Sequence, residues 1–154
     1  MKRNRHVRFL GGGDGSNAIP ATRRELHRRI DRLSGECETL QQQMKNLCTQ
    51  FKTTFHGTTP VHLALRNIRG CLYLEWRAKG NRGRGQSFLD LCGSNQGKQI
   101  IDGLAETVLP VYLDYERQRL ELSLTYRLRF HELRMLRGHL TGLHNLALHG
   151  TQNN

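Results

Sequence analysis

The stretch "LHRRIDRLSGECETLQQQMKNLCTQF" (residues 26–51) carries an apolar side chain at every third or fourth position. Its apolar positions are Leu26, Ile30, Leu33, Cys37, Leu40, Met44, Leu47 and Phe51. These steps alternate between four and three, and such a heptad seam is typical of a helix that packs lengthwise against another helix. Just before it, Thr22 and Glu25 form a Thr-x-x-Glu capping box. We therefore expect one helix over residues 22–55, about 50 Å long at roughly 1.5 Å per residue.

The stretch "CLYLEWR" (residues 71–77) predicts a strand, because apolar and polar side chains alternate along it. The alternation places Trp76 and two leucines on one face, which we expect to be buried. "QSFLDLC" (residues 86–92) predicts a second strand, and the glycine-rich stretch between the two would close a β-hairpin at about 71–92. Residues 61–69 are ambiguous, although their apolar side chains alternate as in a strand.

The last part of the chain is predicted to be helical. We expect a short helix over residues 96–108, a kink or break at Pro110, and a long helix from Val111 to about residue 148. One apolar side of the long helix contains Leu113, Leu120, Leu124, Leu128 and Met135, and a second contains Leu122, Tyr126, Leu133, Leu136 and Leu140. Two apolar sides indicate two neighbours. The second neighbour is either a second copy of the chain or the short helix folded back.

These elements predict an α+β fold that is mostly α. The expected architecture is a long antiparallel helical hairpin, coiled-coil-like, with a β-hairpin between the two long helices. Residues 1–19 are expected to form a flexible basic N-terminal arm that ends in the glycine-rich linker "GGGDGSN". Residues 20–150 then form a single helical domain with the β-hairpin at about 71–92.

The composition points to a polyanionic partner. The 154 residues contain 24 Lys and Arg against 13 Asp and Glu, which gives a formal net charge of +11. Most of these cations are arginines, whose planar guanidinium binds phosphate oxygens in pairs and stacks on bases. A charge imbalance of this size favours nucleic acid as the partner over an acidic protein.

The sequence contains none of the common catalytic or metal-binding motifs. It has no P-loop, no dinucleotide-binding glycine motif within a βαβ unit and no HExxH. The four cysteines form no CxxC or CxxH pair, and the eight histidines are scattered, so we expect no metal site and no cofactor. We expect a non-enzyme in a reduced bacterial cytoplasm, because the sequence shows neither a signal peptide nor an apolar run of membrane-spanning length.

Three basic segments are candidates for contacts with a phosphate backbone. The stretch "EWRAKGNRGRGQSF" (residues 75–88) combines cations with glycines that allow close backbone approach, and the alternative is a solvated turn. The N-terminal arm and one face of the last helix add further cations. The predicted nucleic-acid-binding residues are Arg77, Lys79, Arg82, Arg84, Arg127, Arg134, Arg137, Lys2, Arg3, Arg5 and Arg8, with Tyr73 as a ring that could stack on a base.

Two stretches resemble uncharacterised proteins encoded on bacterial integrating conjugative elements. They are "LYLEWR" (residues 72–77), followed by a basic turn, and "LDYERQRLELSLTYRLRFHEL" (residues 113–133). The matching residues are Leu74, Trp76, Arg77, Glu116, Gln118 or Arg119, Leu122, Ser123 and Leu124. The likeness is loose and covers about residues 65–135, with more Gly and Arg in the loop here. It implies an accessory protein of a mobile element, concerned with DNA maintenance or transfer, and implies no known reaction.

Together these observations predict a non-catalytic nucleic-acid-binding protein, with DNA favoured over RNA. A homodimer is expected, and a protein of the mobile-element machinery is a possible further partner. The alternative is a structural or adaptor protein that binds other proteins through its helical apolar faces. Salt dependence separates the two, since phosphate binding weakens steeply as salt rises and apolar helix pairing does not.

Overall fold

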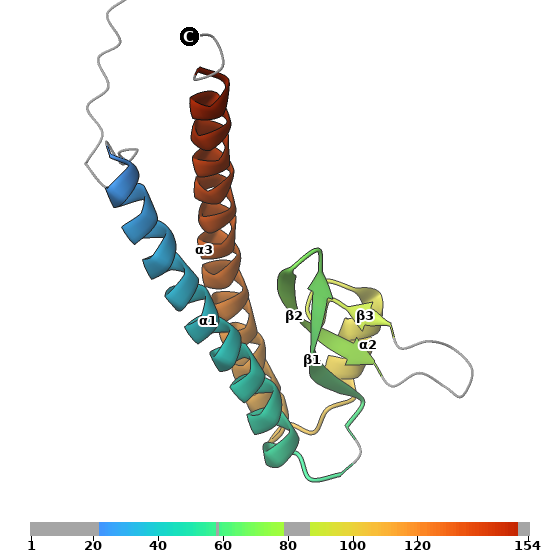
Figure 1. Cartoon of the computed structure of the whole chain (residues 1–154). Coiled ribbons are helices and arrows are strands. Elements are labelled where there is room, and N and C mark those ends of the chain that lie inside the picture. Colours follow the sequence, from blue (N-terminus) through green and yellow to red (C-terminus); the bar gives the residue numbers. More distant parts are fainter. Residues whose placement is uncertain (1–21, 58, 79–86, 151–154) are drawn as a thin grey trace, which may run out of the picture.

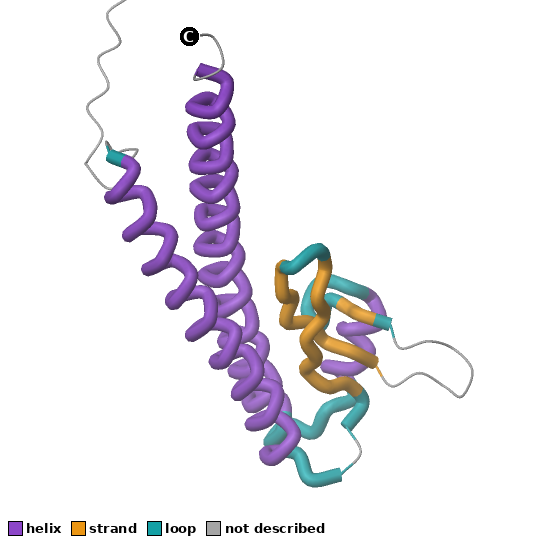
Figure 2. The backbone as a smooth tube through the Cα atoms, in the orientation of Figure 1, coloured by secondary structure: helices purple, strands orange, loops and turns teal. Residues whose placement is uncertain are grey.

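The computed structural model describes residues 22–57, 59–78 and 87–150 (Figure 1). Its elements are α1 (Arg23–Thr54), β1 (Val61–Ile68), β2 (Cys71–Ala78), β3 (Phe88–Leu89), α2 (Asn95–Asp102) and α3 (Leu109–Gly150). The predicted α+β class with mostly helix is confirmed. The helices α1 and α3 lie beside each other, the sheet packs on both of them, β1 on α1 and β2 on α3, and α2 lies beside the sheet (Figure 2). The predicted arm over residues 1–19 lies outside the described residues.

Helix α1 forms where the heptad seam predicted it, within one residue at each end. The Thr22 hydroxyl accepts from the Glu25 N–H, and the Glu25 carboxylate accepts from the Thr22 N–H, so the capping box is complete. Every seam residue is buried except Leu40, which is half-buried. The seam therefore supplies most of the contribution of α1 to the core.

Polar contacts fix α1 and α3 in an antiparallel arrangement. Near the start of α1, Arg29 pairs with Glu132. Further along, Glu36 accepts from the Arg129 guanidinium at 3.0 Å. At the end of α1, the Thr54 and Tyr115 hydroxyls lie 2.7 Å apart. Residue numbers thus rise along α1 while those of its partners fall along α3.

The sheet has the order β1-β2-β3, and its principal hairpin is β1–β2. The ambiguous stretch is thus a full strand, and β2 pairs along its whole length with β1 through a two-residue turn. The predicted partner over residues 86–92 contributes only the two-residue β3. The predicted pairing of β2 with residues 86–92 therefore forms, but it is confined to two residue pairs. The main partner of β2 is β1, on its other edge.

An aromatic cluster joins the sheet to both long helices. The Phe51 ring on α1 lies 5.2 Å from the Trp76 ring on β2, 5.4 Å from Tyr112 and 5.1 Å from Tyr115, all edge-on. Trp76 is fully buried and stacks on Tyr112 at 5.8 Å. The alternation in β2 had predicted this core position for Trp76. Edge-on and stacked pairs of this kind add stability beyond the apolar area that they bury.

The short helix α2 ends at Asp102, with Gly103 as its C-cap, earlier than the predicted residue 108. A Cβ at Gly97 would collide with the backbone carbonyls of Asp90 and Leu91, so only glycine fits this close approach of α2 to the loop before it. Pro110 does not break a helix. It lies in the first turn of α3, where the missing N–H has no intrahelical partner to lose.

The heptad seam generates a matched test of stability. Leu33 is 1 % exposed and Leu40 is half-buried, although both occupy the same seam. Leu33→Asp should lower the free energy of unfolding by at least about 3 kcal/mol, because it places an unpaired carboxylate in the core. Leu40→Asp should cost roughly 1–2 kcal/mol, since water still reaches that side chain. Urea denaturation followed by circular dichroism measures both, and equal losses would contradict this packing.

Candidate nucleic-acid interface

A buried polar link holds the sheet against α3. The Trp76 indole N–H donates to Glu116 Oε2 at 2.6 Å. The Arg119 guanidinium donates to both oxygens of the same carboxylate, at 2.6 and 2.9 Å, and to the Leu74 carbonyl at 3.2 Å. Hydrogen bonding to Glu116 raises the pKa of Arg119. Because carboxylate, indole and guanidinium satisfy one another, β2 is locked to the first turns of α3.

The β1–β2 turn places an arginine at the tip of the hairpin. Arg69 and Gly70 both have positive φ, 52° and 84°, as a type I′ two-residue turn requires. Asn67 Oδ1 accepts from the Gly70 N–H at 2.9 Å and supports the turn. Glycine or asparagine is favoured at both central positions, so an arginine at positive φ carries backbone strain. Strain of this kind is typical of positions retained for function.

A groove opens between this turn and the middle of α3. Its volume is about 760 Å³, and its lining residues are Ile68, Arg69, Cys71, Tyr73, Leu124, Arg127, Leu128, Phe130, His131 and Arg134. The lining thus contains three arginines and a histidine, and no acidic side chain. Elements distant in sequence meet here, since β1 and β2 contribute one wall and α3 the other. A cavity with this lining suits an anionic ligand.

The arginines of the groove differ from most others in the helices and sheet. Arg29, Arg66 and Arg119 are each paired with a glutamate. Within the described part of the chain, Arg69, Arg127 and Arg134 form no ion pair. Arg127 makes one hydrogen bond, from Nε to the Ser123 carbonyl at 3.3 Å, and this leaves its terminal nitrogens available.

Two arginines of the groove lie close enough to Cys71 to affect its pKa. Burial raises the pKa of the Cys71 thiol, whereas a hydrogen bond with Tyr73 and the charges of Arg127 and Arg134 oppose that rise. The charges of two arginines from α3 therefore reach a β2 side chain. Tyr73, half-buried, lines the same groove and presents the only aromatic ring on its sheet side.

The structure brings together only some of the predicted binding residues. Tyr73, Arg127 and Arg134 line the groove. Arg137 does not, because its Nη2 donates to the Ser34 hydroxyl on α1 at 2.9 Å. Arg77 lies on the sheet with its guanidinium 5.0 Å from the Phe88 ring, next to β3 rather than the groove. The remaining candidates lie outside the described residues: Lys79, Arg82, Arg84, Lys2, Arg3, Arg5 and Arg8.

Sequence analysis missed Arg69 and His131 as groove residues. Arg69 was overlooked because residues 61–69 were ambiguous, so no turn was placed after them. The available signal was the dipeptide Arg69-Gly70 between two alternating apolar runs, which fits a two-residue hairpin connection. His131 could be placed only once the hairpin was known to fold back over α3.

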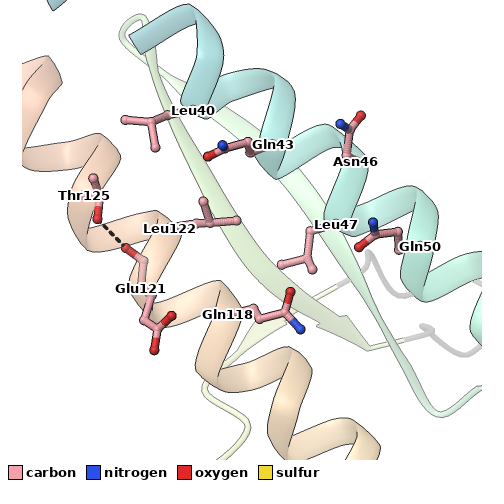
Figure 3. Close-up of a pocket in the computed structure, with 9 residues that line it drawn as sticks. All are labelled: Leu40, Gln43, Asn46, Leu47, Gln50, Gln118, Glu121, Leu122 and Thr125. Carbon is pink, nitrogen blue, oxygen red and sulfur yellow. Dashed lines mark hydrogen bonds between the residues drawn. The ribbon is translucent and has the colours of Figure 1, made fainter. Parts of the chain in front are cut away.

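A second groove between α1 and α3 has a different character (Figure 3). Leucines from both helices lie between them, and amide side chains surround the leucines. Its lining residues are Leu40, Gln43, Asn46, Leu47, Gln50, Gln118, Glu121, Leu122 and Thr125. Glu121 is its one charged residue, and the Thr125 hydroxyl donates to the Glu121 carbonyl at 2.9 Å. Its amides can donate hydrogen bonds to a phosphate, but the groove has no positive charge to attract one, so the arginine-lined groove is the stronger candidate.

The described residues, 22–57, 59–78 and 87–150, hold neither a metal-binding cluster nor a membrane-spanning helix. No three of their His, Cys, Asp and Glu side chains lie close enough together to hold a metal ion. None of their helices is both long and apolar enough to cross a membrane.

The buried link generates a prediction for Glu116. Glu116→Ala leaves the Trp76 N–H and the Arg119 guanidinium without their acceptor, so the free energy of unfolding should fall by about 3–5 kcal/mol. Glu121→Ala is the matched control on the same helix. It removes only an exposed 3.4 Å pair with Arg117 and should cost less than about 1 kcal/mol. Trp76 is the single tryptophan, so its fluorescence during urea unfolding reports on this site. Equal losses of stability in the two variants would show that the buried link does not stabilise the fold.

Comparison of the chain with protein-family models, with curated proteins and with solved structures gave no match to any of the three.

Proposed function

We propose that this chain is a non-catalytic nucleic-acid-binding protein and that the groove between the β1–β2 turn and α3 binds phosphate. One observation carries the proposal. Arg69, Arg127 and Arg134 converge on a groove without acidic residues, and within the described residues none of them forms an ion pair. Arginines that are not needed to hold the fold are available to a polyanion.

The chemistry of the groove fits contacts to the nucleic-acid backbone. Each guanidinium can donate two parallel hydrogen bonds to a phosphate, and contacts of this type carry little base information. Tyr73 adds a ring surface on which an unpaired base can stack. The same proposal treats the two long helices as a coiled-coil-like hairpin that carries the sheet, so that the turn and α3 keep a fixed separation.

The resemblance to conjugative-element proteins supports DNA as the ligand. On that basis we propose an accessory role in the maintenance or transfer of a bacterial mobile element, in the cytoplasm. The cations predicted within residues 1–10 and 79–86 would add further backbone contacts and strengthen binding without adding sequence specificity. A protein of the element's machinery remains a possible partner in this proposal.

One observation favours the alternative of an adaptor protein. Several leucines of α3 are exposed, with Leu124 at 55 % and Leu128 at 62 %, and such a face suits a protein partner. The two functions predict opposite responses to salt. Phosphate binding weakens as salt rises, because the release of counterions into a saltier solution gains less entropy. Apolar association does not weaken in this way.

The double variant Arg127→Ala/Arg134→Ala tests the groove. Both side chains are exposed, so folding should be unchanged. Affinity for a mixed-sequence DNA oligonucleotide should fall, and the slope of log K against log salt should shrink by about two units, one for each lost phosphate contact. Mobility-shift titrations at several salt concentrations measure both quantities, with matched single-stranded DNA, duplex DNA and RNA.

A charge-matched control separates a site from a diffuse basic surface. Arg24→Ala/Arg28→Ala removes two exposed arginines from α1 and changes the net charge equally. If this control lowers the affinity and the salt slope as much as the groove variant, the groove is not the binding site. Arg82→Ala/Arg84→Ala in the same assay measures what residues 79–86 contribute.

Arg69→Asn is expected to change stability and affinity in opposite directions. Asparagine tolerates positive φ better than arginine, so the variant should be more stable by about 0.5–1 kcal/mol. Binding to the oligonucleotide should nevertheless weaken, with the salt slope smaller by about one unit. Thermal melts and mobility shifts on the same preparation measure both. A variant with greater stability and unaltered affinity would remove Arg69 from the site.

A further inference from the structure

One face of α3 exposes a line of large apolar side chains. Leu120, Leu124, Leu128 and Met135 are 53, 55, 62 and 62 % exposed. At 3.6 residues per turn they fall within about 80° of the helix circumference. Single exposed apolar residues are common on proteins, whereas an aligned set marks a contact surface. We call this line, with its continuation towards the C-terminus, the α3 stripe.

The α3 stripe continues through two glycines. Gly138 and Gly142 follow at the same helical spacing, and Leu146, 71 % exposed, comes one turn later. A Cβ built at either glycine meets nothing within 4 Å, so packing inside the monomer does not require a glycine there. Glycine in a helix interior is destabilising, so its presence at two open positions calls for another explanation. Two positions without side chains leave room for the side chains of another helix.

The far end of α3 has no cover from α1. Figure 1 shows α3 continuing beyond the start of α1, and residues 141–150 are all exposed. Helical ends without packing are marginal in water, because most helical stability in proteins comes from a buried apolar face. Leu143 and Leu146 lie in this uncovered part. A partner that covers this end must therefore run along α3 for much of its length.

We propose that a second copy of this chain covers the stripe, with the two α3 helices antiparallel about a two-fold axis at His131. Leu124 lies seven residues before His131, and Gly138 lies seven residues after it. The axis therefore sets Leu124 of each copy opposite Gly138 of the other. By the same symmetry Leu120, eleven residues before His131, lies opposite Gly142, eleven residues after it. Large side chains then face small ones at these two levels, which lets the helices interdigitate there.

The register and the charges favour this arrangement over a parallel pair. Parallel copies in register would set glycine opposite glycine at two levels and leave gaps there. In the antiparallel pair, Glu121 on one flank of the stripe lies near His139 of the second copy. The face spans about 50 Å from Leu113 to Leu146 at roughly 1.5 Å per residue. With its flanks, this length supplies roughly 15 residues per side, which fits an interface at the small end of the usual range.

The same geometry places arginines of the two copies together. Arg127 of each copy lies next to Arg134 of the other, on the flank that carries the groove. These like charges oppose pairing, and salt screens them. Dimerisation is therefore expected to tighten as salt rises, whereas nucleic-acid binding weakens. The opposite responses distinguish failure of the proposed dimer from failure of the proposed function.

Gly138→Leu tests the register, with Gly35→Leu on α1 as the control. Both glycines are helical and open, so neither leucine should disturb the fold of the monomer. Gly138→Leu alone should melt below the parent at micromolar concentration, because it loses the stabilisation that dimerisation provides. Light scattering should give twice the 17.7 kDa of one chain for the parent and for Gly35→Leu at micromolar concentration. Gly138→Leu should be monomeric there, with dimerisation weakened at least about 100-fold. A parent that stays at 17.7 kDa, or a Gly138→Leu variant that stays dimeric, overturns the proposal.

Crosslinking tests the position of the two-fold axis. A short bis-maleimide should join His131→Cys chains into a species of twice the mass, because the two substituted positions meet at the axis. Leu120→Cys chains should not gain this species over the parent, since their substituted positions would lie about 33 Å apart along the helices. Equal crosslinking at both positions would indicate a parallel pair. If the full chain is monomeric and becomes dimeric only when residues 1–21 are deleted, that segment is the occupant instead of a second copy.

Discussion

The hydrogen bond from the Trp76 indole to Glu116 is the constraint on which the rest of the structure depends. It joins β2 to α3 inside an aromatic cluster that also holds the end of α1. Because Arg119 satisfies the same carboxylate and the Leu74 carbonyl, the sheet cannot slide along α3 without leaving buried polar groups unpaired. The position of the β1–β2 turn, and of Arg69 at its tip, follows from this lock.

The arginines divide into those that hold the fold and those that do not. Arg29 and Arg129 pair across the two long helices, and Arg119 lies in the buried link. Arg127 and Arg134 project from α3 towards the turn without an ion pair in the described part of the chain. Part of the net charge of +11 is therefore concentrated on one face of α3. The α3 stripe shares Leu124 and Leu128 with the lining of the groove, so the two proposed surfaces overlap on one helix.

Prediction from the sequence succeeded where the signal was local and periodic. The heptad seam and capping box gave α1 to within a residue at each end, and the alternation of residues 71–77 gave β2 with Trp76 inside. It was incomplete where a strand has two neighbours. The predicted pairing of β2 with residues 86–92 is present but short, and the longer pairing with β1 on the other edge was not predicted. Helix α2 stopped early at Gly103, a single residue whose effect the apolar pattern did not show.

The sequence by itself determined the helical periodicity, the buried face of β2 and the excess of positive charge, because each depends on residues a few positions apart. Tertiary structure decided which cations meet. Arg127 and Arg134 were candidates among many, and Arg137, one turn further along α3, is directed to Ser34 instead. Arg69 joined the groove because the hairpin folds back over α3, a contact between residues about sixty positions apart. Such a contact depends on packing between elements, and no local pattern encodes it.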